Sequence, residues 1–148
     1  MKYFLDCEFN EFGGDLISLA LVREDNECIY LVYPEPTEYG PWVKENVVPI
    51  IWSIPSPLPG MAYNVDQESG ARVIAKFLAD DPNPVIITDW PDDIRYFCQA
   101  IITGPGMMIN IPQVIFHMVR VNAYPTTLKD AVQHNAYWDA MALKYLLT

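Results

Sequence analysis

Cysteines, basic residues and long apolar runs are all scarce in this chain. The three cysteines, Cys7, Cys28 and Cys98, lie far apart, so we expect buried thiols and neither a disulfide framework nor a zinc knuckle. No apolar run approaches the ~20 residues that a membrane span needs, and Asp6 interrupts any signal-peptide core at its start. The sequence therefore predicts a cytoplasmic protein with no membrane partner.

The scarcity of basic residues limits how the chain can bind nucleic acid. Nine Lys and Arg stand against nineteen Asp and Glu, which gives a formal net charge of −10. A broad electrostatic nucleic-acid binder is disfavoured, because neutralising phosphates requires Lys and Arg. An enzyme that holds only the last few nucleotides remains compatible, since bound divalent metal can supply the positive charge.

The length and the apolar periodicity predict one α/β domain. The 148 residues fit a single domain, residues 1–148, with one hydrophobic core. Strand-like patterns joined by short turns predict an antiparallel meander, and a later buried run predicts a further strand. Together these elements predict a mixed sheet flanked by helices. The strands are expected at residues 2–9, 16–22, 28–33 and 84–88, the helices at 42–47, 68–78, 91–101 and 133–147, and a strand or helix at 113–119.

Two acids stand in the otherwise apolar first strand. The two-residue period of a strand puts Asp6 and Glu8 on one face, roughly 7 Å apart, and turns Cys7 and Phe9 to the other face. Neighbouring carboxylates repel each other and lose hydration when buried, and a cation relieves both costs. The alternative is that both acids are solvent-exposed on an edge strand.

Further acids and a histidine lie near two predicted helix starts. Asp89 and Asp92 suit capping and the helix dipole, with Asp89 as the expected N-cap, whereas Asp93 lies one step further into the helix. His134 and Asp139 open the last helix in the string HNAYWDA, where each alone is an ordinary polar position. Tyr137 and Trp138 are expected to pack in the core.

Taken in order, these three clusters resemble the motifs of one family. The motifs are Asp6-x-Glu8-Phe9, the string DWPDDIRYF at 89–97, and His134 five residues before Asp139. They resemble the DnaQ-like DEDDh 3′–5′ exonucleases of the RNase H-like superfamily. Asn135 stands where the sister DEDDy branch has tyrosine. The strings MKYFLDCEF, LISLALV and GPWV resemble most the RNase AS type of exoribonuclease, over nearly the whole chain but more weakly from 107 to 124.

This resemblance implies a fold, a reaction and a set of ligands. The fold would be an RNase H-like mixed sheet, with three antiparallel strands followed by parallel ones. Asp6, Glu8, Asp93 and Asp139 would hold two divalent ions, Mg²⁺ or Mn²⁺, and His134 would act as general base. The substrates would be 3′ ends of RNA or of single-stranded DNA, the products 5′-mononucleotides, and the protein a homodimer. Because the second motif has Asp89 where the family commonly has Asn, Asp92 remains an alternative to Asp93.

Several side chains are candidates for holding the substrate. Bases can stack on exposed aromatic rings without a net positive charge, and phosphates can pair with basic groups. The aromatic candidates are Phe12, Trp42, Trp52 and Trp90, and the basic candidates are Lys44, Arg72 and Arg95. The residues also allow three other hypotheses: an RNase H-like endonuclease, a nucleic-acid-binding module without activity, and a structural protein with surface carboxylates.

Overall fold

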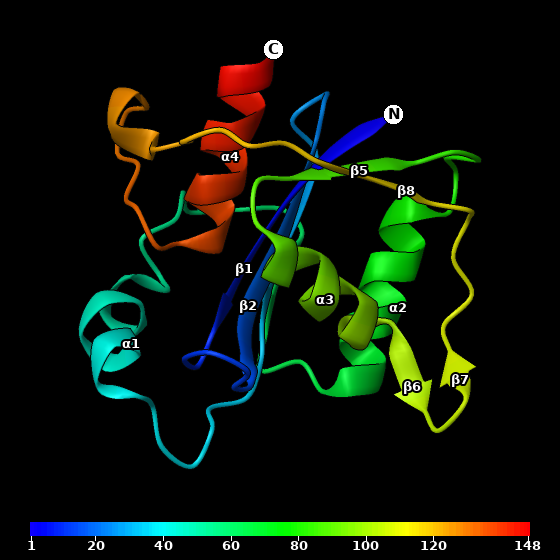
Figure 1. Ribbon diagram of the computed structural model, residues 1–148, viewed down its shortest axis with the longest axis horizontal. Coiled ribbons are helices and arrows are strands. Elements are labelled where there is room, and N and C mark those ends of the chain that lie inside the picture. The colour runs from blue at the N-terminus through cyan, green and yellow to red at the C-terminus, as the bar shows by residue number, and fades with distance from the viewer.

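The computed structural model describes residues 1–148 except for the side chain of Thr126, and it contains a six-stranded sheet, a two-stranded hairpin and four α-helices (Figure 1). The strands of the large sheet are β1 (Lys2–Phe9), β2 (Leu16–Arg23), β3 (Cys28–Val32), β4 (Met61–Tyr63), β5 (Val85–Thr88) and β8 (Ile115–Met118). The hairpin pairs β6 (Ile102–Gly104) with β7 (Met107–Met108). The helices are α1 (Pro41–Asn46), α2 (Gln67–Leu78), α3 (Pro91–Ala100) and α4 (Ala136–Leu147), and short 3₁₀ turns cover Val48–Ile50 and Pro125–Thr127.

The large sheet is mixed, with strand order β4-β3-β2-β1-β5-β8. β2 pairs antiparallel with β1 and with β3, whereas the pairs β1–β5, β5–β8 and β3–β4 are parallel. β2 is therefore the one strand of this sheet that runs against the others. The chain leaves β1 towards β2 and β3 on one side and later returns to β5 on the other, which makes the carboxyl ends of β1 and β5 a topological switch point.

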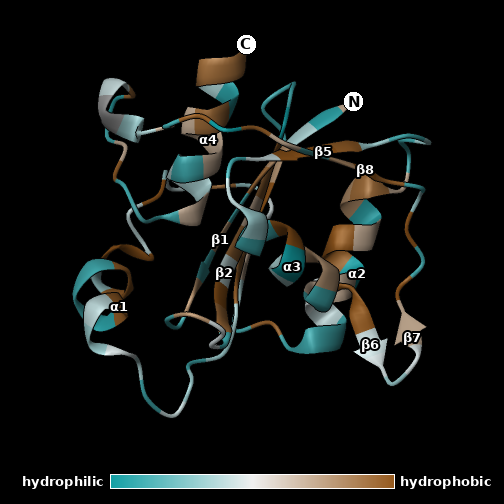
Figure 2. Cartoon of the chain, in the orientation of Figure 1, coloured by the Kyte–Doolittle hydropathy of each residue, from teal (hydrophilic) through white to brown (hydrophobic). Residues whose placement is uncertain are grey.

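Apolar side chains on both faces of the sheet form the core. On one face Tyr3, Leu5 and Cys7 pack with Ile74 of α2 and Phe97 of α3. On the other face, residues of β2 and β3 pack with α1 and α4, and Phe4 packs with Leu143 of α4. Figure 2 shows apolar colouring along much of the central strands, and helices in which apolar and polar residues alternate.

Most predicted elements are confirmed, with several corrections. The strands 2–9, 16–22 and 28–33, the helices 42–47, 68–78 and 91–101, and the strand 84–88 occur within two residues of the predicted bounds, and 113–119 is a strand. The predicted helix start at 133 is wrong, because α4 begins at Ala136. Of the three cysteines that were expected to be buried, only Cys7 is buried. Among the described residues, each helix is too short or too polar to cross a membrane.

Candidate functional site

Asp6 and Glu8 project from the same face of the central strand β1. Cys7, between them, points the other way and is 4% exposed in the core cluster under α2 and α3, as the two-residue period predicts. β1 is flanked by β2 on one side and, through residues 2–4, by β5 on the other. The alternative of two acids exposed on an edge strand is therefore wrong.

Asp93 is the buried acid of the α3 start. It is 1% exposed, and both of its carboxylate oxygens accept hydrogen bonds from β1 and β5. The Cys7 backbone N–H donates to Oδ1 at 3.2 Å, and the Thr88 hydroxyl donates to Oδ2 at 2.6 Å. Asp92 instead turns towards the surface, where it pairs with Arg95 at 3.0 Å and accepts from the Trp90 indole at 3.2 Å.

Asp89 does not cap α3, so the prediction of an Asp89 N-cap is wrong. The N-cap is Trp90, which makes no side-chain capping bond, and Pro91 occupies the first turn. The helix can begin without a side-chain cap because a proline in the first turn has no N–H that needs one. The Asp89 carboxylate lies instead beside those of Asp6 and Asp93, with one oxygen of each within 4.8 Å of the other two.

His134 and Asp139 lie on opposite sides of the true start of α4. Asn135 is the N-cap, and its side chain accepts from the Trp138 N–H. His134 therefore precedes the helix, in a left-handed conformation with φ 68°. Its backbone N–H donates to Asp139 Oδ2 at 3.1 Å, and its ring packs edge-on against Trp42 with centroids 4.9 Å apart. One ligand atom each of Glu8, His134 and Asp139 lie within 4.8 Å of one another.

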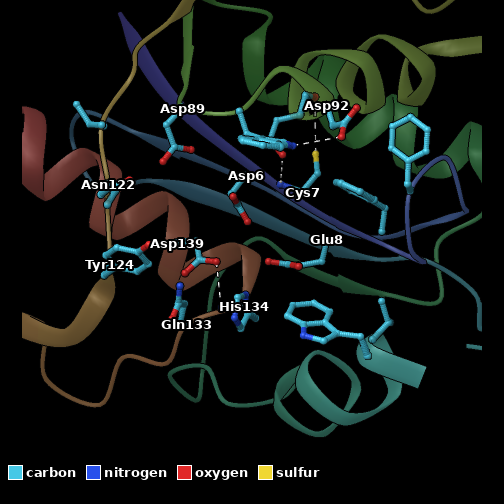
Figure 3. A pocket seen from close by; sticks show the side chains of 18 of the residues that line it. Asp6, Cys7, Glu8, Asp89, Asp92, Asn122, Tyr124, Gln133, His134 and Asp139 are labelled. Atoms are coloured by element: carbon cyan, nitrogen blue, oxygen red, sulfur yellow. Dashed lines mark hydrogen bonds between the residues drawn. The ribbon is translucent and has the colours of Figure 1, made fainter. Parts of the chain in front are cut away.

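Five carboxylates thus meet in one place, and we call Asp6, Glu8, Asp89, Asp93 and Asp139 the acidic cluster. Figure 3 shows Asp6 in the middle, with Asp89 on one side and Glu8, Asp139 and His134 on the other. The cluster draws on β1, the end of β5, α3 and α4, which are segments far apart in sequence.

Burial and mutual repulsion disfavour the charged forms of these acids. Burial, reinforced by the Asp93 charge, raises the pKa of Asp6 well above its usual range, and burial with the Asp139 charge does the same to the pKa of Glu8. Burial raises the pKa of Asp93 and of Asp139 to about 7, against the lowering effect of their hydrogen bonds. Burial also lowers the pKa of His134, which favours the neutral imidazole.

The acidic cluster fits divalent cations. Within the described part of the chain, Asp6 Oδ2 and Asp139 Oδ1 are buried oxygens without a hydrogen-bond partner. Buried carboxylate oxygens without donors are costly, and a cation is the partner that would satisfy them. Carboxylate oxygens are the ligands that the hard cations Mg²⁺ and Mn²⁺ prefer.

The acidic cluster lines a cavity of about 780 Å³. Of the predicted stacking residues, Phe12, Trp42 and Trp90 line it, with Phe12 88% exposed. Trp52 does not; it packs against Tyr63 with ring centroids 4.9 Å apart. The predicted basic residues Lys44, Arg72 and Arg95 are not among the lining residues either. Arg72 pairs with Glu68, and Arg95 pairs with Asp92 and lies over the Phe12 ring.

Sequence reasoning missed some residues of this cavity. They are Asp89 as a cluster member, Arg120, Asn122, Tyr124 and Gln133. Asp89 could have been found, because it directly follows a strand parallel to β1, and such strand ends meet at one edge of a sheet. No sequence pattern marks the segment that carries Arg120.

Neither a protein-family model nor a curated protein matches this chain.

Proposed function

We propose that this protein is a metal-dependent 3′–5′ exonuclease of the DEDDh type, acting on RNA. The observation that carries the proposal is that Asp6, Glu8, Asp93 and Asp139 share one cavity with His134, although they come from separate parts of the sequence. These are the residues that the three motifs of the resemblance supply. The strand order β3-β2-β1-β5-β8, with only β2 reversed, agrees with the RNase H-like fold that the resemblance implies.

The residues of the cavity suit hydrolysis of a phosphodiester bond. Two divalent ions, when bound, would lower the pKa of the attacking water and stabilise charge on the attacking and leaving oxygens. Asp6, which Figure 3 shows between Asp89 and the His134 side, would contribute to holding the ions, and Glu8 and Asp139 would do so on the His134 side. Asp93, which accepts hydrogen bonds from Cys7 and Thr88, would keep the β5 side of the acidic cluster in position.

His134 suits the part of general base. Its lowered pKa keeps the imidazole neutral near neutral pH, so that one ring nitrogen is free to accept the proton of the attacking water. Its backbone N–H donates a hydrogen bond to Asp139, and its ring packs edge-on against Trp42. The imidazole therefore lies beside Glu8 and Asp139, with one ligand atom of each of the three within 4.8 Å of the other two.

The cavity suits a terminal nucleotide. A volume of about 780 Å³ is in the range of small-molecule sites. Phe12, Trp42, Trp90 and Tyr124 surround it with exposed rings on which bases can stack. Arg120, the one Lys or Arg among the described lining residues, is placed to pair with a phosphate. A second copy of the chain, as in the homodimer that the resemblance implies, would bring further basic residues to the substrate.

The decisive experiment follows the two ends of labelled RNA separately. The protein is incubated with 3′-labelled or 5′-labelled RNA and single-stranded DNA, in Mg²⁺ or in EDTA. We expect stepwise loss from the 3′ end of RNA, release of 5′-mononucleotides, and no reaction in EDTA or with Asp6→Asn. Internal cuts that survive His134→Ala would indicate an RNase H-like endonuclease instead, and an absence of any cut in Mg²⁺ and Mn²⁺ would reject the proposal.

A further inference from the structure

Asp89 has no structural task that accounts for its position. It lies directly after β5, partly buried, yet it caps no helix. Among the described residues its carboxylate makes no hydrogen bond or ion pair with any other residue. An acid in this place therefore costs stability in the metal-free protein.

The neighbours of Asp89 indicate that a bound cation would offset this loss of stability. One of its oxygens lies within 4.8 Å of oxygens of Asp6 and Asp93, which is close enough for the three to share one cation. Asp6 Oδ2 is buried and without a partner in the described structure, and Figure 3 shows the Asp6 carboxylate between Asp89 and the His134 side. This unpartnered oxygen is a second observation, independent of the clustering of acids, that indicates a missing cation.

Asp93 is less free than Asp89 to bind an ion directly. Its two oxygens already accept hydrogen bonds from Cys7 and Thr88, and it is 1% exposed. Asp89 accepts no hydrogen bond from another residue, lines the cavity, and lies beside Asp6 (Figure 3). The two acids therefore differ in what they can offer: Asp93 is fixed in place by the protein, whereas Asp89 has both oxygens available.

We infer that Asp89 is a metal ligand, which together with Asp6 holds the ion on the β5 side of the acidic cluster while Asp93 positions the site. This inference rests on the proposed metal-dependent function. It changes the assignment that the resemblance implies, in which Asp6, Glu8, Asp93 and Asp139 hold the two ions and Asp89 holds neither. It also explains why an aspartate follows β5, where the family commonly has a neutral amide.

The test measures metal binding by the full chain, not activity. Mn²⁺ is titrated calorimetrically into metal-free wild type, Asp89→Asn, Asp92→Asn and Asp139→Asn. Asp92 is the matched control, because it lies in the same segment and lines the same cavity but pairs with Arg95. We expect Asp89→Asn to lose one Mn²⁺ or to bind it at least about ten-fold more weakly. Asp92→Asn should remain within about two-fold of wild type, and Asp139→Asn should weaken the ion on the His134 side.

Thermal unfolding gives a second readout that separates a ligand from a structural residue. In EDTA, Asp89→Asn should melt at a higher temperature than wild type, because the substitution removes a charge repelled by its neighbours. On addition of Mn²⁺, the melting temperature of Asp89→Asn should rise by less than that of wild type. Unchanged Mn²⁺ binding, or a lower melting temperature in EDTA with an undiminished gain in Mn²⁺, would overturn the inference.

The inference and the proposed function can fail separately. If Asp89→Asn impairs Mn²⁺ binding but wild type trims no RNA, Asp89 is a metal ligand in a protein of another activity. If wild type trims RNA and Asp89→Asn binds Mn²⁺ like wild type, the proposed exonuclease activity is supported and the assignment of Asp89 as a metal ligand is rejected.

Discussion

The Thr88 hydroxyl determines how the most buried acid of the cluster is held. It donates to Asp93 Oδ2 at 2.6 Å, and this bond is the strongest influence that lowers the pKa of Asp93 against burial. Thr88→Val keeps the shape of the side chain but removes the donor. We expect a loss of about 1–3 kcal/mol in the free energy of unfolding at about pH 8, where Asp93 is charged. Mg²⁺-dependent activity should fall roughly ten-fold, as for other residues that orient metal ligands.

Denaturant unfolding and RNA trimming assays check this prediction. Thr148→Val is the control, since Thr148 is exposed at the end of α4 and should change stability by less than about 0.5 kcal/mol. Equal effects of the two substitutions would contradict the role given to Thr88.

His134 combines a reactive side chain with a backbone that favours glycine. Its φ of 68° is costly for a residue with a Cβ, by about 1–2 kcal/mol. We expect the free energy of unfolding of His134→Gly to exceed that of His134→Ala by about 1 kcal/mol, because only glycine adopts this φ without the cost of a Cβ. Both variants should lose about 10²–10⁴-fold in RNA trimming, the usual contribution of a general base.

The comparison of the two variants is the internal control for that prediction. Chemical denaturation in EDTA gives the stability difference, and trimming of 3′-labelled RNA gives the rate. An alanine variant as stable as the glycine variant would mean that the backbone is relaxed, and an active variant of either kind would remove His134 from the chemistry.

At the scale of elements, the start of α4 determines where His134 and Asp139 lie. The Asn135 side chain accepts from the Trp138 N–H at 3.1 Å and donates to the Ile50 carbonyl at 2.9 Å, so it joins the helix to the turn after α1. Asn135 is also 1% exposed. Asn135→Ala should therefore cost about 2 kcal/mol and should also lower RNA trimming, because it removes both the helix cap and the hydrogen bond that ties the helix start to the Ile50 carbonyl.

A second helix cap provides the matched control. Asp66 caps α2 through the Ser69 N–H at 2.7 Å, but it is exposed and remote from the cavity. We expect Asp66→Ala to cost about 1 kcal/mol and to leave trimming unchanged. Thermal unfolding and the trimming assay check both variants, and equal losses of activity would show that α4 does not position the site.

The elements also show which parts of the fold were predictable. β1, β2, β3 and α2 were predicted closely, because each is long enough to display its apolar period. β4, β6 and β7 are two or three residues long, too short to display an apolar period. β4 is a strand because it pairs with the distant β3, and β6 and β7 are strands because they pair with each other. The start of α4 was placed too early because Gln133 and His134 suit a first helical turn by composition, whereas the Asn135 cap excludes them.

The same distinction applies to the site. Asp6 and Glu8 were paired from the period of one strand, whereas Asp139 was assigned only through the resemblance, and the buried position of Asp93 agrees with its preference over Asp92. Asp89 was misassigned because a local capping pattern accounted for it, while its real neighbours come from β1 and α3. Arg120 enters the cavity through the tertiary path of the chain after β8, which no local pattern reports.

At the scale of the whole molecule, the negative net charge means that the proposed substrate binding depends on bound cations. The formal net charge is −10, and the cavity itself is lined mainly by acids among its ionisable residues. In the absence of metal such a surface repels a phosphate backbone. Bound cations would reverse the local field at the one place where the proposed substrate must enter, so binding and chemistry would depend on the same ions.

The stability of the whole molecule should therefore fall with rising pH when metal is absent. Asp93 and Asp139 have pKa values of about 7 in the folded protein against ordinary values of 3.8 when unfolded. Between these values the folded chain binds more protons than the unfolded chain. The stabilisation due to each group is complete below about pH 4 and is lost as the pH rises through about 7, by up to about 1.4 kcal/mol per pH unit and group.

Excess Mg²⁺ should reverse this trend, because metal binds the deprotonated carboxylates and stabilises only the folded chain. Calorimetric melting curves between about pH 5 and pH 8, in EDTA and in Mg²⁺, check both halves of the prediction. We expect the melting temperature to fall with pH in EDTA and the gain due to Mg²⁺ to grow with pH, whereas Asp6→Asn should flatten both trends. A melting temperature that rises with pH in EDTA would mean that the acids are not buried together, and the metal-dependent function would lose its physical basis.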